Sequence, residues 1–149
     1  MGVICILSVL IMGNNTFAQQ PVKWSYDAKK LGANKYELHI RANIDAGWHL
    51  FSQKQPESAI ALPTTIQFTK NPLISLKGKI KEQGDLKKRK EETLDIESWL
   101  YEGEVSFVQL IETKGKAKTN VNGNIEFQVC TDEKCLPPAT ISFSIPLKE

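Results

Sequence analysis

The segment that decides the fold is NIEFQVCTDEKCLPPATISFSI, residues 124–145. It begins and ends with runs in which apolar and polar residues alternate, the pattern of half-buried β-strands. Between the runs stand Cys130 and Cys135, separated by four polar residues and followed by Leu136 and two prolines. The pattern predicts that the two cysteines mark the mouth of a hairpin-like connection, where opposed strand residues lie within disulfide reach. Cys130 shares its face with polar residues, so we expect it to point away from the core.

Three roles are open for this cysteine pair. A structural disulfide that closes so short a loop stabilises the fold by only roughly 2 kcal/mol, because it removes little freedom from the unfolded chain. A redox-active disulfide agrees better with an outward Cys130 and an exposed polar loop. A periplasmic metal carrier would use Cys130, Cys135 and His49, but one cysteine pair without a second pair or a well-spaced histidine pair lacks a full ligand set. We therefore expect neither a metal nor another cofactor.

The first 18 residues have the features of a secretory signal peptide. Val3–Met12 is an apolar run too short to span a bilayer, and Thr16-Phe17-Ala18 ends it with small residues at the positions typical of cleavage. Cleavage after Ala18 removes Cys5 and leaves residues 19–149 as one domain. Its two cysteines fit an oxidising compartment. The formal net charge of +2 gives no electrostatic case for a nucleic-acid partner.

Short alternating runs, separated by turns rich in Gly, Pro and Asn, make up most of the remaining chain. The clearest run covers residues 36–45, where aromatic and aliphatic residues occupy one face and His39 shares the other with charged and polar residues. Residues 104–112 are apolar on both faces, which is typical of a central strand. No long segment has helical spacing. The sequence therefore predicts an all-β sandwich.

Two polar connections contain unusual groups of residues. Lys87-Lys88-Arg89-Lys90 is followed at once by Glu91-Glu92, and this balance of charge favours a solvated loop. Asp95–Gly103 contains Trp99-Leu100-Tyr101 between acidic residues, an apolar cluster that needs a surface to cover. His49 stands beside Trp48 and Phe51; it either fills an edge of the core or serves at a site, and the spacing names no partner for it.

Three pieces of the sequence together resemble the N-terminal, or alpha, domain of the DsbD thiol:disulfide interchange protein family, also called disulfide bond corrector domains. They are Gly47-Trp48-His49-Leu50-Phe51, then Leu100-Tyr101-Glu102-Gly103-Glu104-Val105-Ser106-Phe107, and finally Cys130 to Pro138. The similarity spans nearly the whole chain after the signal peptide, and the cysteine segment with its two prolines is the most specific piece.

The resemblance implies a monomeric, immunoglobulin-like antiparallel β-sandwich in the periplasm, with Cys130 and Cys135 as the redox pair. It implies a thioredoxin-like partner, a DsbD/CcdA-type membrane electron donor acting in trans because the chain stops at Glu149, and periplasmic thiol proteins as recipients. By position, Trp99, Leu100 or Tyr101 would form the cap that shields the disulfide. His49 and Phe51 would flank the site. Cys135, the second cysteine, would join the partner.

The residues beside the cysteines suggest a direction of attack. Asp132 and Glu133 disfavour a thiolate and Lys134 offsets them only in part, so the disulfide is better suited to be attacked than its thiols are to act as strongly activated nucleophiles. Cys135 opens onto prolines that cannot continue an interior ladder, so we expect it, not Cys130, to form the mixed disulfide. The alternative from another functional class is a secreted β-sandwich binding module with a structural disulfide.

Overall fold

The computed structural model describes residues 20–115 and 118–148. The predicted signal peptide, residues 1–18, lies outside the described residues, and Cys5 with it. In chain order the strands are β1 (Val22–Lys30), β2 (Lys35–Ile44), β3 (His49–Phe51), β4 (Thr65–Phe68), β5 (Ile74–Gly84), β6 (Lys87–Glu91), β7 (Ile96–Tyr101), β8 (Glu104–Thr113), β9 (Asn120–Phe127), β10 (Val129–Cys130) and β11 (Ala139–Pro146).

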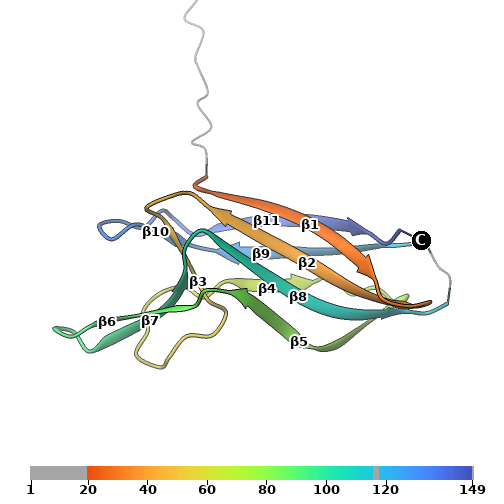
Figure 1. The fold of residues 1–149 in the computed structure, drawn as a ribbon, viewed down its shortest axis with the longest axis horizontal. Coiled ribbons are helices and arrows are strands. Elements are labelled where there is room, and N and C mark those ends of the chain that lie inside the picture. Colours follow the sequence, from red (N-terminus) through yellow and green to blue (C-terminus); the bar gives the residue numbers. More distant parts are fainter. Residues whose placement is uncertain (1–19, 116–117, 149) are drawn as a thin grey trace, which may run out of the picture.

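Two sheets pack face to face as a sandwich (Figure 1). One has the strand order β1-β2-β8-β5 and the other the order β11-β9-β4, and the strands pair in antiparallel fashion. The inward side chains of both sheets meet in one apolar core, in which Leu38, Phe107, Ile125 and Phe127 are almost completely buried. The predicted all-β sandwich is confirmed, and its architecture is immunoglobulin-like.

Residues that alternate between apolar and polar in the sequence alternate between buried and more exposed in the strands of the structure. In β2 the side chains of Leu38, Ile40 and Ala42 are 0–1% exposed, and the intervening residues are only half-buried. β8 has neighbours on both sides in its sheet and buried residues on both faces, as expected for a central strand. Period-two alternation is a local property of an extended chain, so it is visible before any pairing is known.

A third sheet consists of short strands in the order β10-β3-β7-β6 and is called here the small sheet. It corrects two expectations, because Lys87–Glu91 is strand β6 and not a solvated loop, and Ile96–Tyr101 is strand β7 within the supposed polar connection. The two strands pair as an antiparallel hairpin. β6 is mostly exposed on both faces, so it has no apolar alternation by which the sequence could reveal it, and its pairing with β7 alone defines it as a strand.

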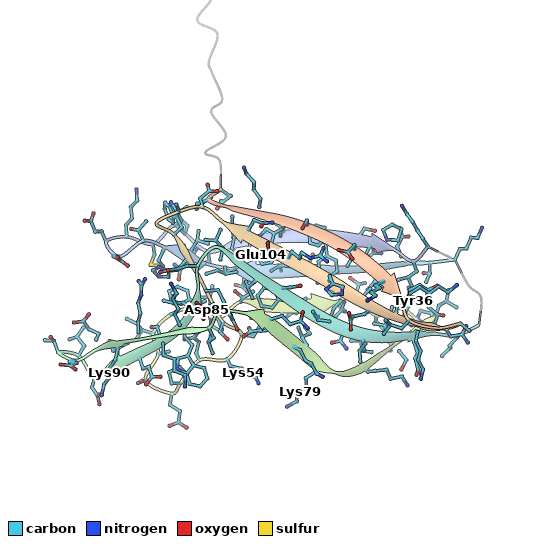
Figure 2. All side chains as sticks on the ribbon, in the orientation of Figure 1. Tyr36, Lys54, Lys79, Asp85, Lys90 and Glu104 are labelled. Carbon is cyan, nitrogen blue, oxygen red and sulfur yellow. A yellow bond between two sulfur atoms is a disulfide. The ribbon has the colours of Figure 1, made fainter. Side chains whose placement is uncertain are left out.

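The β6–β7 hairpin and the loop between the cysteines lie at the same end of the molecule (Figure 1). Figure 2 draws the side chains in the same orientation, with Lys90 on the projecting hairpin and Tyr36 toward the opposite end. Among the described residues there is no helix long and apolar enough to cross a membrane. The fold thus gathers the small sheet, the hairpin and the cysteines into one region.

Candidate redox site

Cys130 and Cys135 form a disulfide, with their Cα atoms 4.0 Å apart. The two residues also make an antiparallel bridge, and the Leu136 amide donates to the Val129 carbonyl oxygen at 3.0 Å as the chain doubles back. Thr131 shapes the intercysteine loop, residues 131–134: its amide donates to the Lys134 carbonyl oxygen, and its hydroxyl oxygen accepts from the Lys134 amide. The predicted hairpin-like connection is therefore present, with the disulfide at its mouth.

The two sulfur-bearing residues differ sharply in exposure. Cys135 is exposed, whereas Cys130 is 2% exposed. The predicted parity of Cys130 is correct, since it does not join the main core, but the expectation of an outward, open position is wrong. Cys130 instead belongs to a second apolar cluster with Phe51 and Leu100, against which Ala61 packs. An incoming thiolate therefore meets Cys135 first.

Strand register explains how this second cluster forms. Cys130 of β10 lies opposite His49 of β3, and Phe51 of β3 lies opposite Leu100 of β7. Because alternate residues of a strand share a face and directly paired residues lie side by side, all four occupy one face of the small sheet. We call this face the site face. The opposite face of the small sheet carries Leu50 and Tyr101, which both belong to the main core.

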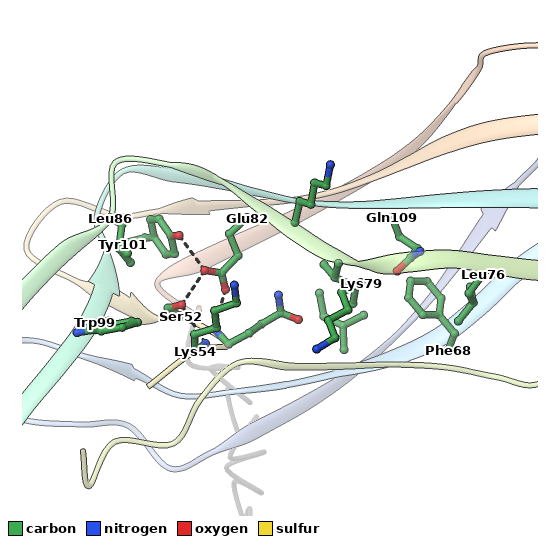
Figure 3. Close-up of a pocket in the computed structure, with 14 residues that line it drawn as sticks. Ser52, Lys54, Phe68, Leu76, Lys79, Glu82, Leu86, Trp99, Tyr101 and Gln109 are labelled. Carbon is green, nitrogen blue, oxygen red and sulfur yellow. Dashed lines mark hydrogen bonds between the residues drawn. The ribbon is translucent and has the colours of Figure 1, made fainter. Parts of the chain in front are cut away.

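The three candidate cap residues are divided between these two faces. Leu100 is 1% exposed and packs with Cys130 on the site face. Trp99 and Tyr101 alternate with it on β7 and line a groove of about 900 Å³ between β4 and β5, shown in Figure 3. The structure therefore places Leu100, but not Trp99 or Tyr101, against the cysteine. Phe51, expected only to flank the site, makes the equivalent contact from β3.

His49 is 6% exposed and meets the Phe51 ring edge-on, with the ring centroids 5.3 Å apart. Burial is the largest influence on the imidazole and lowers its pKa from the ordinary value of 6.5, and the Arg89 guanidinium lowers it further. Asp132 and Glu102 act in the opposite direction. At neutral pH the His49 ring is therefore uncharged. It lies beside Cys130 in the register of the small sheet.

Arg89 is a site residue that the sequence did not reveal. On β6 it pairs with Ser98, two positions from Leu100, so it belongs to the site face. Its guanidinium forms ion pairs with Asp132 of the intercysteine loop and with Glu102. Asp132 is thus partly neutralised by a residue remote in sequence, which weakens the expected disfavouring of a thiolate. No local pattern separates Arg89 from the three lysines around it.

The Arg89–Asp132 pair should hold the hairpin against the intercysteine loop. Asp132→Asn keeps the size of the side chain and removes its charge, so it should speed hydrogen exchange of the β6 amides by up to about fivefold, the effect of an exposed ion pair worth 0–1 kcal/mol. High salt should speed exchange in the unaltered protein in the same way.

Glu133→Gln is the matched control for this measurement, because Glu133 lies in the same exposed loop and has no ion-pair partner in the described part of the chain. It should leave β6 exchange unchanged. Arg89→Ala combined with Asp132→Asn should exchange no faster than Arg89→Ala alone. Equal effects of the Asp132 and Glu133 variants would contradict the pairing.

Glu82 fixes the inner side of the same sheet. Its carboxylate accepts hydrogen bonds from the Ser52 hydroxyl at 2.6 Å, the Gln53 amide at 2.6 Å and the Tyr101 hydroxyl at 2.8 Å (Figure 3). Burial, followed by the Glu82 contact, raises the pKa of Tyr101 well above its ordinary value. These bonds connect β5 of the sandwich to β7 and to the chain just after β3. They hold the small sheet in place behind Cys130.

No group of three or more His, Cys, Asp or Glu side chains in the described ranges is arranged to hold a metal ion. In the disulfide form, Cys130 and Cys135 cannot join His49 as metal ligands, because their sulfurs are bonded to each other and a metal-ligating cysteine binds as a free thiolate. The arrangement is that of a disulfide between an exposed Cys135 and a Cys130 buried among apolar side chains, with His49 opposite Cys130 in the strand pairing.

Comparison with known proteins identifies the family. Residues 15–146 match the family model described as thiol:disulfide interchange protein DsbD, N-terminal. None of the curated sequences compared with the chain matches it. Solved structures do match in fold: the reduced DsbD N-terminal domain of Neisseria meningitidis has a TM-score of 0.53 at 14% identity, with 85% of this chain and 86% of that chain covered.

Two further structures are similar. The N-terminal periplasmic domain of ScsB from Proteus mirabilis has a TM-score of 0.53 at 16% identity, with 83% of this chain and 44% of that chain covered. A complex between the DsbD and PilB N-terminal domains of Neisseria meningitidis contains a chain with a TM-score of 0.50 at 10% identity, with 84% of this chain and 82% of that chain covered. At such identities these likenesses concern the fold alone. The family match, which spans nearly the whole chain, shows that this protein belongs to the family of N-terminal domains of the thiol:disulfide interchange protein DsbD.

Proposed function

We propose that the chain is a periplasmic thiol:disulfide relay, exported by residues 1–18, in which the Cys130–Cys135 disulfide receives two electrons and passes them on. The donor is a thioredoxin-like protein or a DsbD/CcdA-type membrane electron-transfer protein acting in trans, and the recipients are periplasmic thiol proteins. The difference in exposure between Cys135 and Cys130 carries this proposal. Because Cys135 is exposed and Cys130 is buried, we expect a partner thiolate to attack the disulfide at Cys135 Sγ.

The relay consists of balanced exchange steps. A donor thiolate attacks Cys135 Sγ, a donor–Cys135 disulfide forms, the Cys130–Cys135 bond breaks, and Cys130 leaves as a thiolate that takes up a proton. The second thiolate of the donor then attacks the donor sulfur that is bonded to Cys135. This closes the donor disulfide and releases Cys135 as a thiolate, which takes up a proton. The donor is oxidised to a disulfide, and the chain is reduced to two thiols. Onward transfer is the reverse sequence with the disulfide of a recipient.

Family membership supports the reaction class, since the family is named for thiol:disulfide interchange. The complex of the Neisseria DsbD domain with the PilB N-terminal domain supports a partner that docks as a separate domain. The site face supports selectivity, because Phe51 and Leu100 enclose Cys130 and leave Cys135 accessible. Arg89 partly neutralises Asp132 in the loop where an anionic thiolate must arrive, which lowers the repulsion between them.

The reduction potential of the cysteine pair tests the proposal. We expect a value above about −300 mV, within the range of exchangeable disulfides, whereas structural disulfides of secreted proteins lie below that value. The measurement is equilibration in glutathione redox buffers, read by mass after alkylation of free thiols. A potential below about −300 mV, with no reaction toward a reduced thioredoxin-like protein, would instead favour the secreted binding module with a structural disulfide.

A further inference from the structure

On the site face a buried histidine is paired with a buried cysteine, although a disulfide does not need a histidine beside it to form. His49 lies opposite Cys130 in the antiparallel pairing of β3 and β10, and side chains paired in this way have their Cβ atoms about 4.5–5.5 Å apart. Both residues are buried, at 6% and 2% exposure. Side chains paired in this way can bring an imidazole nitrogen and a sulfur atom within hydrogen-bond reach, which is the geometry that proton transfer requires.

In the reduced protein, Cys130 must lose its proton in apolar surroundings before it can react, and a neighbouring imidazole could accept that proton. When a recipient is bound to Cys135 through a mixed disulfide, Cys130 must attack as a thiolate, because the thiol itself is a poor nucleophile. Its surroundings are Phe51 and Leu100, and apolar burial raises the pKa of a cysteine thiol. Cys130 therefore needs a base beside it.

The charged groups around His49 come from several elements. Arg89 stands on β6, Glu102 in the turn after β7, and Asp132 in the intercysteine loop, while Lys134 lies over the ring of the adjacent Trp48 at 5.8 Å. Burial and Arg89 lower the His49 pKa, and the two carboxylates oppose them. The imidazole is accordingly neutral at neutral pH, and one of the two nitrogens of a neutral imidazole carries no proton and can accept one.

We propose that His49 is the general base that takes the proton from the Cys130 thiol when Cys130 resolves the mixed disulfide held on Cys135. The role rests on the proposed relay function and deepens it. In the step, the proton moves from Cys130 Sγ to the imidazole, the Cys130–Cys135 bond forms, the bond from Cys135 to the recipient breaks, and the recipient leaves as a thiolate. In the reverse direction the imidazolium returns the proton to the departing Cys130.

The aromatic disulfide 5,5′-dithiobis(2-nitrobenzoate) separates the two exchange steps optically. At one equivalent, attack by Cys135 of the reduced protein releases a first coloured thiolate, and resolution by Cys130 releases a second. His49→Gln should slow the second release about 100-fold at pH 7, the lower range of general base catalysis, and leave the first within about twofold. Cys130→Ser should release one equivalent only, which identifies the second phase.

His39 provides a matched control, since it is the other histidine of the chain and hydrogen bonds Glu37 on β2 instead of facing the cysteines. His39→Gln should leave both phases unchanged. In the unaltered protein the rate of the second phase should fall as the pH drops through the His49 pKa, below 6.5, because a protonated imidazole cannot accept the proton. Above that pKa the rate in the unaltered protein should be level, whereas in His49→Gln it should keep rising about tenfold per pH unit, following the free thiolate.

A nuclear magnetic resonance titration of His49 in the reduced, unaltered protein keeps the test independent of how the variant folds. Its midpoint should coincide with the midpoint of the second phase. The role of His49 is overturned if the rate of the second phase does not change with pH around this midpoint. It is also overturned if folded His49→Gln shows the same second-phase rate as the unaltered protein. Failure of the relay function would appear separately, as a potential too low for exchange, while both colour phases could still be measured.

Discussion

Cys130→Ser should still form a covalent complex with a thioredoxin-like partner, whereas Cys135→Ser should form almost none. The remaining thiolate of each variant must approach the partner's disulfide along its S–S axis, so an accessible sulfur reacts faster than a buried one. Cys135 is exposed, while Cys130 is 2% exposed and packed against Phe51 and Leu100. We expect the rate of trapping to differ by at least about tenfold between the two variants, given that exchange rates depend on access.

The measurement uses a partner whose resolving cysteine has been removed and whose remaining cysteine is activated as an aromatic disulfide. Complexes are counted on non-reducing gels over time. Repeating the reaction in urea provides the control, because unfolding removes the burial of Cys130 and should make the two variants equally reactive. Faster trapping by Cys135→Ser under native conditions would reverse the assigned roles, and equal native rates would mean that burial does not select the sulfur.

Leu100→Ala should increase the rate at which glutathione reduces the disulfide by about tenfold, since both access and the leaving thiol control exchange. Removing the side chain opens a route to Cys130, which Leu100 covers at 1% exposure. It also admits water to the sulfur that must leave as a thiolate, and solvation lowers the cost of that charge. Both effects act in the same direction.

Trp99→Ala is the matched control for the cap, because Trp99 precedes Leu100 on β7 but faces the groove, with Lys88 4.5 Å from its ring. It should leave the reduction rate nearly unchanged. Leu100→Ala should lower the free energy of unfolding by about 2–5 kcal/mol, as expected for a truncated buried leucine, so thermal melting must establish that it is folded at the assay temperature.

Mass mapping of the glutathione adducts completes the test of the cap. Adducts should lie on Cys135 in the unaltered protein and appear on Cys130 as well in Leu100→Ala. A rate increase in Trp99→Ala as large as that in Leu100→Ala would remove the distinction between the two faces of β7.

The architecture of the sandwich was predictable because it depends on short-range patterns. The alternation of Leu38, Ile40 and Ala42 in β2, the two apolar faces of β8, and the turn signals between runs all indicate strands without knowledge of their partners. The same alternation correctly put Cys130 on the face opposite Phe127 and Val129, away from the main core. The face on which a strand residue lies can be predicted from the sequence, because it depends only on the alternation of residues two positions apart.

The small sheet was predicted less well, and β6 shows why. Lys87–Glu91 is charged and exposed throughout most of its length, so neither face carries a sequence signal. Without β6 the sequence indicates no partner for β7, so the apolar group at 99–101 has the pattern of a single stretch of loop. Once β7 is recognised, its alternation separates Leu100 from the residues on either side of it.

By itself the sequence determined the extended strands, the face on which each strand residue lies and the hairpin that brings Cys130 to Cys135. Only the tertiary structure decided what covers that face: Phe51 and Leu100 against Cys130, His49 opposite it, and Arg89 paired with Asp132. The reason is physical. Alternation follows from the local geometry of one strand, whereas the exposure and charge environment of a sulfur depend on side chains that strand pairing brings together from distant parts of the chain.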